Sequence, residues 1–215
     1  MNATLARLHQ YDPAALGLAD FGRGENYMTR QVERWSKQYR ASETGVIEDM
    51  ERLIVWLPAH LPPPAPVRLV HGDYRLDNII VALGEPRIAA VLDWELATLG
   101  DPLADLTFHL MAWDMPRAEG GAGFGTLAGR DLARLGIPSR VAYVDAYVAR
   151  TGLDPRPHLA AYLAYNFFRL AAILQGIAGR LRDGTAVSEN AAGMALMVRP
   201  LADKAWEFAR EAGAR

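Results

Sequence analysis

The sequence predicts a mainly helical α+β fold with a small β insert near the middle of the chain. Apolar residues recur at helical spacing toward both ends, as Val32, Trp35 and Tyr39 do within 26–40. Between 67 and 92 they instead form short runs rich in isoleucine and valine, bounded by turn residues, which is typical of strands. A chain of 215 residues can bury a core without disulfides or metals, so we expect one domain over 1–215.

The helical segments are defined by the spacing of their apolar residues. We expect Ser42 or Thr44 to cap the third helix and Pro58 to stop it. The glycine-rich run 115–125 is expected to be a mobile surface loop. The expected helices are 2–9, 26–40, 47–57, 103–113, 140–151, 157–180 and 189–211.

Three short strands are expected in the middle of the chain, over 67–70, 78–81 and 88–92. The second and third are joined across the turn residues Gly84-Glu85-Pro86, so they should form a hairpin. A hairpin brings the start of its first strand next to the end of its second. Side chains at these two positions are therefore expected to lie close together.

Composition narrows the function. The net charge of −2 gives no basic surface for nucleic acid, and nothing suggests binding to an anionic membrane. The absence of cysteine excludes disulfides, zinc–thiolate sites and thiol nucleophiles. The amino terminus starts no long apolar run, and polar residues interrupt 159–178, so neither a signal peptide nor a membrane span is expected. These features indicate a cytoplasmic protein.

Polar residues capable of chemistry cluster around the β insert. The run HGDYRLDN occupies 71–78, directly after the first strand, and Leu-Asp-Trp-Glu at 92–95 ends the hairpin. Asn78 and Asp93 should meet at neighbouring strand ends and offer the hard oxygen ligands that Mg²⁺ prefers. Asp73 follows Gly72 on a tight loop beside them, where a proton acceptor would stand next to a metal-bound phosphate.

Each of these residues also has a structural interpretation. An Asp after a Gly is most often only a turn residue. Asp77 and Glu95 fit solvated positions, and Asp101 fits a cap for the helix that begins near Pro102. The order of Asp73, Asn78 and Asp93, with strands where the chemistry needs them, favours a catalytic site.

The order H-x-D-x4-N, hairpin, D is similar to the catalytic arrangement of protein kinases. The glycine at the second position and the ending Leu-Asp-Trp-Glu resemble instead the aminoglycoside and choline kinase-like phosphotransferases. Within that superfamily the chain is most similar to the phosphotransferase domains related to those fused to some acyl-CoA dehydrogenases. The segments 30–35 and 165–170 also look like this family, so the resemblance covers nearly the whole chain.

The resemblance implies a Mg²⁺-dependent kinase that transfers the γ-phosphoryl group of ATP, or of another nucleoside triphosphate, to a hydroxyl of a small molecule. Asp73 would be the catalytic base or the carboxylate that orients the hydroxyl. Asn78 and Asp93 would hold Mg²⁺ and, through it, the nucleotide. Arg75 would contact the transferred phosphate or a substrate carboxylate. The two arginines Arg75 and Arg169 favour a neutral or anionic acceptor, with a hydroxy acid or its acyl-CoA ester as an example.

Two further residues have supporting roles in this interpretation. His71 is expected to brace the catalytic loop through hydrogen bonds, because phosphoryl transfer does not require a histidine proton shuttle. Asp105 is expected to accept backbone donors of the catalytic loop and so to fix its shape.

The resemblance also implies which part of a kinase this chain represents. No strand–glycine–strand segment with a following lysine precedes position 71. We therefore expect the carboxy-terminal lobe of a protein-kinase-like fold without its amino-terminal lobe, and activity that is impaired in this chain alone.

Two other functions remain open at this point. The chain could be a non-catalytic binding or interaction module, possibly a homodimer that covers exposed apolar surface. It could also be a metal-dependent hydrolase that uses the same carboxylates, which would need another ligand nearby, such as His109.

Overall fold

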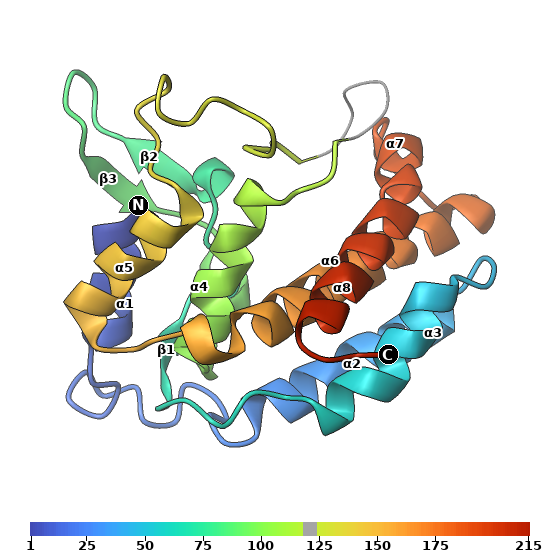
Figure 1. Ribbon diagram of the computed structural model, residues 1–215, viewed down its shortest axis with the longest axis horizontal. Coiled ribbons are helices and arrows are strands. Elements are labelled where there is room, and N and C mark those ends of the chain that lie inside the picture. The colour runs from blue at the N-terminus through green and yellow to red at the C-terminus, as the bar shows by residue number, and fades with distance from the viewer. Residues whose placement is uncertain (118–123) are drawn as a thin grey trace. The chain divides into compact units, whose positions relative to one another are not determined.

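The computed structural model describes residues 1–117 and 124–215 (Figure 1). The predicted loop 115–125 therefore lies partly outside the described residues. The chain divides into two compact units. The first unit comprises Met1–Tyr27, Pro63–Leu110 and Asp131–Pro157, and the second comprises Met28–Pro62, Met111–Arg130 and His158–Arg215.

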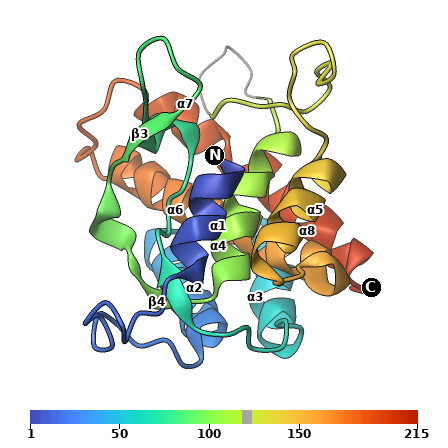
Figure 2. The same cartoon turned by 90° about the vertical axis from the view of Figure 1, so that its left-hand side faces the viewer.

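Three helices and four short strands form the first unit. The helices are α1 (Asn2–Gln10), α4 (Pro102–Leu110) and α5 (Arg140–Thr151). Figure 2 shows α1 beside α4 and α5. Ser139 caps α5, since its hydroxyl accepts a hydrogen bond from the Ala142 amide, and Gly152 ends it in the left-handed conformation.

The strands of the first unit pair in two small antiparallel sheets. Strand β1 (Arg68–Val70) pairs with β4 (Thr98–Gly100), with Leu69 opposite Leu99. Strand β2 (Ile79–Val81) pairs with β3 (Ile88–Val91), with Ile79 opposite Val91. The sequence did not predict β4, because three residues that end in glycine carry too little alternation to indicate a strand.

Five helices form most of the second unit. The long helix α6 is buried along most of its length, and α7 and α8 pack against it. Helix α3 also contacts α8. Among the described residues, no helix is both long enough and apolar enough to cross a bilayer. The five helices are α2 (Tyr27–Ser42), α3 (Glu48–Trp56), α6 (Leu159–Arg182), α7 (Ala191–Leu196) and α8 (Val198–Glu211).

Two details of the predicted helices are wrong. Neither Ser42 nor Thr44 caps α3: Ser42 donates back to the Gln38 carbonyl at the end of α2, and Thr44 accepts a hydrogen bond from Gln175. The predicted helix 189–211 is two helices, α7 and α8, which meet at Met197. The sequence carries a signal for this break, because Pro200 is tolerated in the first turn of α8 but would interrupt a helix that ran continuously through it.

Candidate active site

The loop 71–75 follows β1 directly and forms the centre of the candidate site. Gly72 has a φ of +83°, and a Cβ atom there would lie 2.8 Å from the Leu96 carbonyl oxygen. Only glycine avoids both the backbone strain and this collision. Glycine at position 72 therefore allows the backbone at Leu96, which follows β3, to pack closely against the loop.

Asp105 on α4 anchors this loop through hydrogen bonds to its backbone. Its Oδ2 accepts a hydrogen bond from the His71 amide at 2.7 Å, and its Oδ1 accepts one from the Gly72 amide at 2.9 Å. The ring Nε2 of His9 lies 3.1 Å from Oδ2. Asp105 thus accepts two backbone donors of the loop.

The electrostatics of Asp105 follow from these contacts. Burial disfavours the charged form and on its own would raise the pKa of this carboxyl. The hydrogen bonds from His9 and from the His71 and Gly72 amides outweigh burial and lower the pKa below its ordinary value. A buried carboxylate with three donors is satisfied, so it can act as a fixed acceptor for the loop.

His71 connects the loop to the hairpin. Its Nε2 lies 2.8 Å from the Leu92 carbonyl oxygen, which can only accept, so Nε2 carries a proton. The Asp73 amide approaches Nδ1 of the same ring at 3.2 Å and therefore donates to an unprotonated nitrogen. The ring of Trp94 lies against His71, with 4.7 Å between their centroids. His71 thus holds Asp73 and the residue before Asp93 in one arrangement.

Asn78 and Asp73 are joined directly. Nδ2 of Asn78 donates to the Asp73 carbonyl at 2.9 Å and to Asp73 Oδ2 at 3.0 Å. Both neighbours are acceptors, so the amide nitrogen must face them. The oxygen Oδ1 of Asn78 is consequently the amide atom that does not face Asp73.

Asp93 lies next to Asn78 through the hairpin backbone. The Leu92 amide donates to the Asn78 carbonyl at 2.8 Å, one step beyond the Ile79–Val91 pair. Asp93 itself adopts a left-handed conformation with a φ of +63°, which is uncommon for a residue with a side chain and is found mostly at functional sites and turns. Asp73, Asn78 and Asp93 are therefore gathered at one end of the hairpin.

Arg75 lies beside the proposed base. Its Nε is 3.5 Å from Asp73 Oδ2, and its Nη1 is 3.5 Å from Asp77 Oδ2. Asp77 is mostly exposed, in agreement with a solvated position. The guanidinium of Arg75 is thus next to the carboxylate of Asp73.

Other polar residues near the site have structural environments. Asp101 accepts hydrogen bonds from the Leu103 and Ala104 amides and caps α4. His109 is buried against the rings of Tyr74 and Tyr143, and burial lowers its pKa to about 4. Within 1–117 and 124–215, no group of three or more His, Asp or Glu side chains could hold a metal. The hydrolase hypothesis therefore gains no further ligand from the structure.

Sequence reasoning missed His9, which contacts the anchor Asp105, and Tyr147, which contacts His9. A signal for the first existed, because His9 follows Leu5 and Leu8 on the apolar side of a short helix. A fully buried histidine needs a polar partner, but the sequence does not show which carboxylate provides it.

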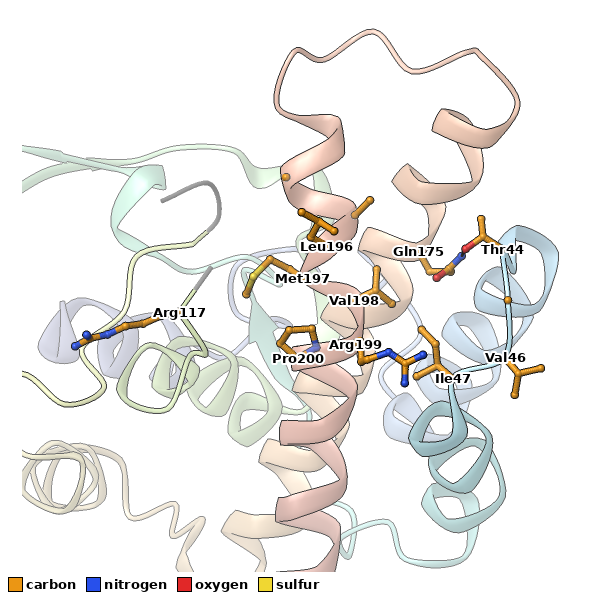
Figure 3. Close-up of a pocket in the computed structure, with 13 residues that line it drawn as sticks. Thr44, Val46, Ile47, Arg117, Gln175, Leu196, Met197, Val198, Arg199 and Pro200 are labelled. Atoms are coloured by element: carbon orange, nitrogen blue, oxygen red, sulfur yellow. Dashed lines mark hydrogen bonds between the residues drawn. The ribbon is translucent and has the colours of Figure 1, made fainter. Parts of the chain in front are cut away.

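A separate hollow lies in the second unit (Figure 3). It has a volume of about 570 Å³ and lies between the α2–α3 connection and the junction of α7 with α8, where Gln175, Met197 and Arg199 are among its lining residues. None of the six predicted site residues lines it, since all six lie in the first unit.

Comparison with known proteins identifies the class. Residues 1–165 match the model of the phosphotransferase enzyme family, and this segment contains all six predicted site residues. The chain therefore belongs to the phosphotransferase enzyme family.

Particular relatives refine this assignment. The chain is 44% identical over its whole length to mouse acyl-CoA dehydrogenase family member 10, of which it covers 20%, and 39% identical over 96% of its length to chicken acyl-CoA dehydrogenase family member 11, of which it covers 27%. The chain thus spans only 20% to 27% of the length of these two relatives. The similarity to such relatives that the sequence predicted is confirmed.

Solved structures agree with the family. A predicted aminoglycoside phosphotransferase from Ralstonia eutropha superposes with a TM-score of 0.92 at 45% identity, covering 98% of this chain and 63% of that one. An ethanolamine kinase from Plasmodium vivax superposes with a TM-score of 0.57 at 14% identity, covering 98% and 59%. The second likeness concerns the fold alone. A mainly helical, kinase-like fold with small antiparallel sheets is therefore confirmed.

The anchor can be tested by replacing Asp105 with asparagine. This change places an NH₂ group where a buried oxygen accepts backbone donors, so we expect Asp105→Asn to lower the free energy of unfolding by about 2–5 kcal/mol at pH 7. Urea denaturation measures this difference. The control is Asp77→Asn, an exposed carboxamide in the same loop region, which should change stability by less than about 0.5 kcal/mol.

The pH dependence of the stability difference between wild type and Asp105→Asn provides a second test. Because the folded pKa of Asp105 is lowered, its charge contributes stability above the unfolded pKa, and this contribution is lost as the pH falls through the folded value. The gap between wild type and Asp105→Asn should therefore shrink below a pH of about 3.8, the ordinary aspartate value. A gap that stays constant down to acid pH would contradict an ionised anchor.

Proposed function

We propose that this chain is the catalytic part of a Mg²⁺-dependent kinase that transfers the γ-phosphoryl group of ATP to a hydroxyl of a small molecule. The observation that carries the proposal is the pair of hydrogen bonds from Asn78 Nδ2 to Asp73. They fix the base next to an amide whose oxygen faces away from it. Family membership supports the reaction class.

The residues present fit a magnesium ion. Mg²⁺ in kinases takes one or two carboxylate or amide oxygens from the protein and fills its other positions with water and phosphate oxygens. Oδ1 of Asn78 and the exposed carboxylate of Asp93 provide such a set at one end of the hairpin. When bound, the ion would neutralise charge on the phosphates of the nucleotide.

Asp73 would carry out the proton step. Its carboxylate would orient the acceptor hydroxyl and take its proton as the hydroxyl oxygen bonds to the γ-phosphorus and the bond from phosphorus to the β–γ bridging oxygen breaks, leaving ADP. Arg75 would then exchange its contact with Asp73 for the phosphoryl oxygens, where charge develops. The protein would thus contribute mainly by positioning the acceptor hydroxyl and by placing charges next to the phosphoryl oxygens.

The acceptor is proposed to be neutral or anionic. A cationic aminoglycoside favours acidic pockets, whereas the catalytic loop carries Arg75 beside its base. The names of the relatives point to acyl-CoA metabolism in those proteins. A hydroxy acid or its acyl-CoA ester is therefore the first acceptor class to test, with an aminoglycoside as comparison. Use of ATP fits a cytoplasmic location.

The role of Asp73 is tested by Asp73→Asn in a phosphoryl-transfer assay. We expect kcat to fall about 10²-fold or more while KM for ATP changes little, since proton acceptance is lost but the nucleotide contacts remain. The assay uses this chain and a longer form that also carries an amino-terminal lobe. Asp77→Asn is the control and should retain activity. Unchanged turnover of Asp73→Asn would show that the assigned role is wrong.

A second candidate is a non-catalytic interaction module, and one observation favours it. Seven large apolar side chains around β2, β3 and the segments next to them are exposed, which is more than isolated surface residues normally explain. We call this group the hairpin surface. It consists of Leu76, Ile80, Val81, Leu83, Leu92, Trp94 and Leu96.

If a second copy of the chain covers the hairpin surface, the protein will be a dimer in solution. Sedimentation equilibrium should then show dissociation constants in the range of about 1–100 µM, and Leu83→Asp should shift the chain to monomer. Val55→Asp is the matched control, because Val55 is also apolar and largely exposed but lies on α3. A wild-type chain that stays monomeric at a concentration of about 100 µM would exclude the homodimer.

A further inference from the structure

The hydrogen bonds that hold the catalytic loop continue beyond Asp105 into two more helices. His9 on α1 approaches Asp105 with Nε2 at 3.1 Å, and its Nδ1 lies 2.7 Å from the hydroxyl oxygen of Tyr147 on α5. All three side chains are buried. A continuous path therefore runs from Tyr147 through His9 and Asp105 to the amides of His71 and Gly72.

The hydrogen bond between His9 and Asp105 has one possible direction. Asp105 is ionised and can only accept, so His9 Nε2 must carry the proton between them. Burial and the nearby charge of Asp105 raise the pKa of Tyr147, so its hydroxyl keeps its proton. This hydroxyl, which can donate or accept, completes the contact at Nδ1 of His9. Tyr147 thus holds the His9 ring in the orientation that turns Nε2 toward Asp105.

The position of Tyr147 is itself fixed by contacts between α1 and α5. Asn2 donates to the Tyr143 carbonyl at 2.8 Å near one end of α1, and Gln10 donates to the Arg150 carbonyl at the other end. The rings of His9 and Tyr147 meet edge to face between these two contacts, with 5.8 Å between centroids. The packing of α1 against α5, outside the catalytic loop, therefore fixes the position of the Tyr147 hydroxyl.

We propose that His9 and Tyr147 are positioning residues of the phosphotransferase site. Tyr147 holds the His9 ring so that its Nε2–H supplies Asp105 with a third donor and so fixes the amides that place Asp73. If the ring turned away, Asp105 would keep only its two backbone donors. This proposal rests on the proposed function for its effect on turnover, but not for its effect on the loop.

Two pairs of variants separate this role from general packing. Tyr147→Phe keeps the buried ring and removes only the donor, whereas Tyr143→Phe removes a buried hydroxyl one turn earlier on the same helix, where the ring packs against His109. His9→Gln can place an amide NH₂ near the position of Nε2 and still donate to Asp105. His9→Asn reaches only the position of Nδ1 and cannot.

The first readout is spectroscopic and needs no substrate. Long-range ¹⁵N–¹H NMR spectra of the His9 ring in the 215-residue chain should show an Nε2 proton that exchanges slowly with water in wild type and in Tyr143→Phe. In Tyr147→Phe this proton should exchange about tenfold faster or more, because the ring is no longer held toward Asp105. Amide hydrogen exchange at His71 and Gly72 should be about tenfold faster or more in Tyr147→Phe and His9→Asn, and close to wild type in Tyr143→Phe and His9→Gln.

The second readout is turnover in the form used for the Asp73 assay. We expect Tyr147→Phe and His9→Asn to lower kcat about 10-fold to 100-fold with KM for ATP within about twofold, because the base is misplaced while the nucleotide contacts remain. His9→Gln should recover most of the loss. A purely structural role would instead lower the folded fraction and leave kcat per folded molecule unchanged.

Several outcomes would overturn the proposal. These are a wild-type His9 ring with no proton on Nε2, exchange at His71 and Gly72 that is equal in Tyr147→Phe and Tyr143→Phe, or a kcat of Tyr147→Phe equal to that of Tyr143→Phe. If wild type transfers no phosphoryl group to any acceptor, the proposed function fails. The ring and amide signals then still decide whether Tyr147 positions the loop.

Discussion

The structure of the site depends on one buried carboxylate. Asp105 accepts the two backbone amides that open the catalytic loop, and the carboxylate remains ionised in a buried place because three donors surround it. Without this acceptor the amides of His71 and Gly72 would be buried without partners, at a cost of about 1–3 kcal/mol each. The loop could then no longer hold its left-handed turn at Gly72 in one conformation.

Further hydrogen bonds connect this loop to the residues proposed for the chemistry. His71 is hydrogen-bonded to the Leu92 carbonyl, and Asn78 is hydrogen-bonded to the carboxylate of Asp73. Phosphoryl transfer needs little covalent help from a protein, so accurate placement of a few charges accounts for most of its catalysis. A rigid loop on a helix anchor suits such a reaction better than a site on a long flexible segment.

The sequence predicted the parts of this arrangement that depend on local pattern. The catalytic loop, the hairpin and helices such as 140–151 could be predicted, because spacing and turn residues determine them. The strand β4 could not, since it depends on pairing with a distant strand. The break at Met197 has a local signal in Pro200, which the helical spacing of the apolar residues obscured. The partners His9 and Tyr147 were missed for the same reason as β4: contacts between residues 138 positions apart leave no mark on a single sequence.

The central claim is that loop and hairpin gather Asp73, Asn78 and Asp93 around one divalent ion, and paramagnetic NMR tests it most directly. Mn²⁺, added below one equivalent together with a non-hydrolysable ATP analogue to the ¹⁵N-labelled chain, broadens signals of nearby nuclei first. The account predicts early loss of the amide signals of 73, 78–79 and 92–94, restored by excess Mg²⁺. Early broadening elsewhere, or equal broadening across the chain, would contradict it.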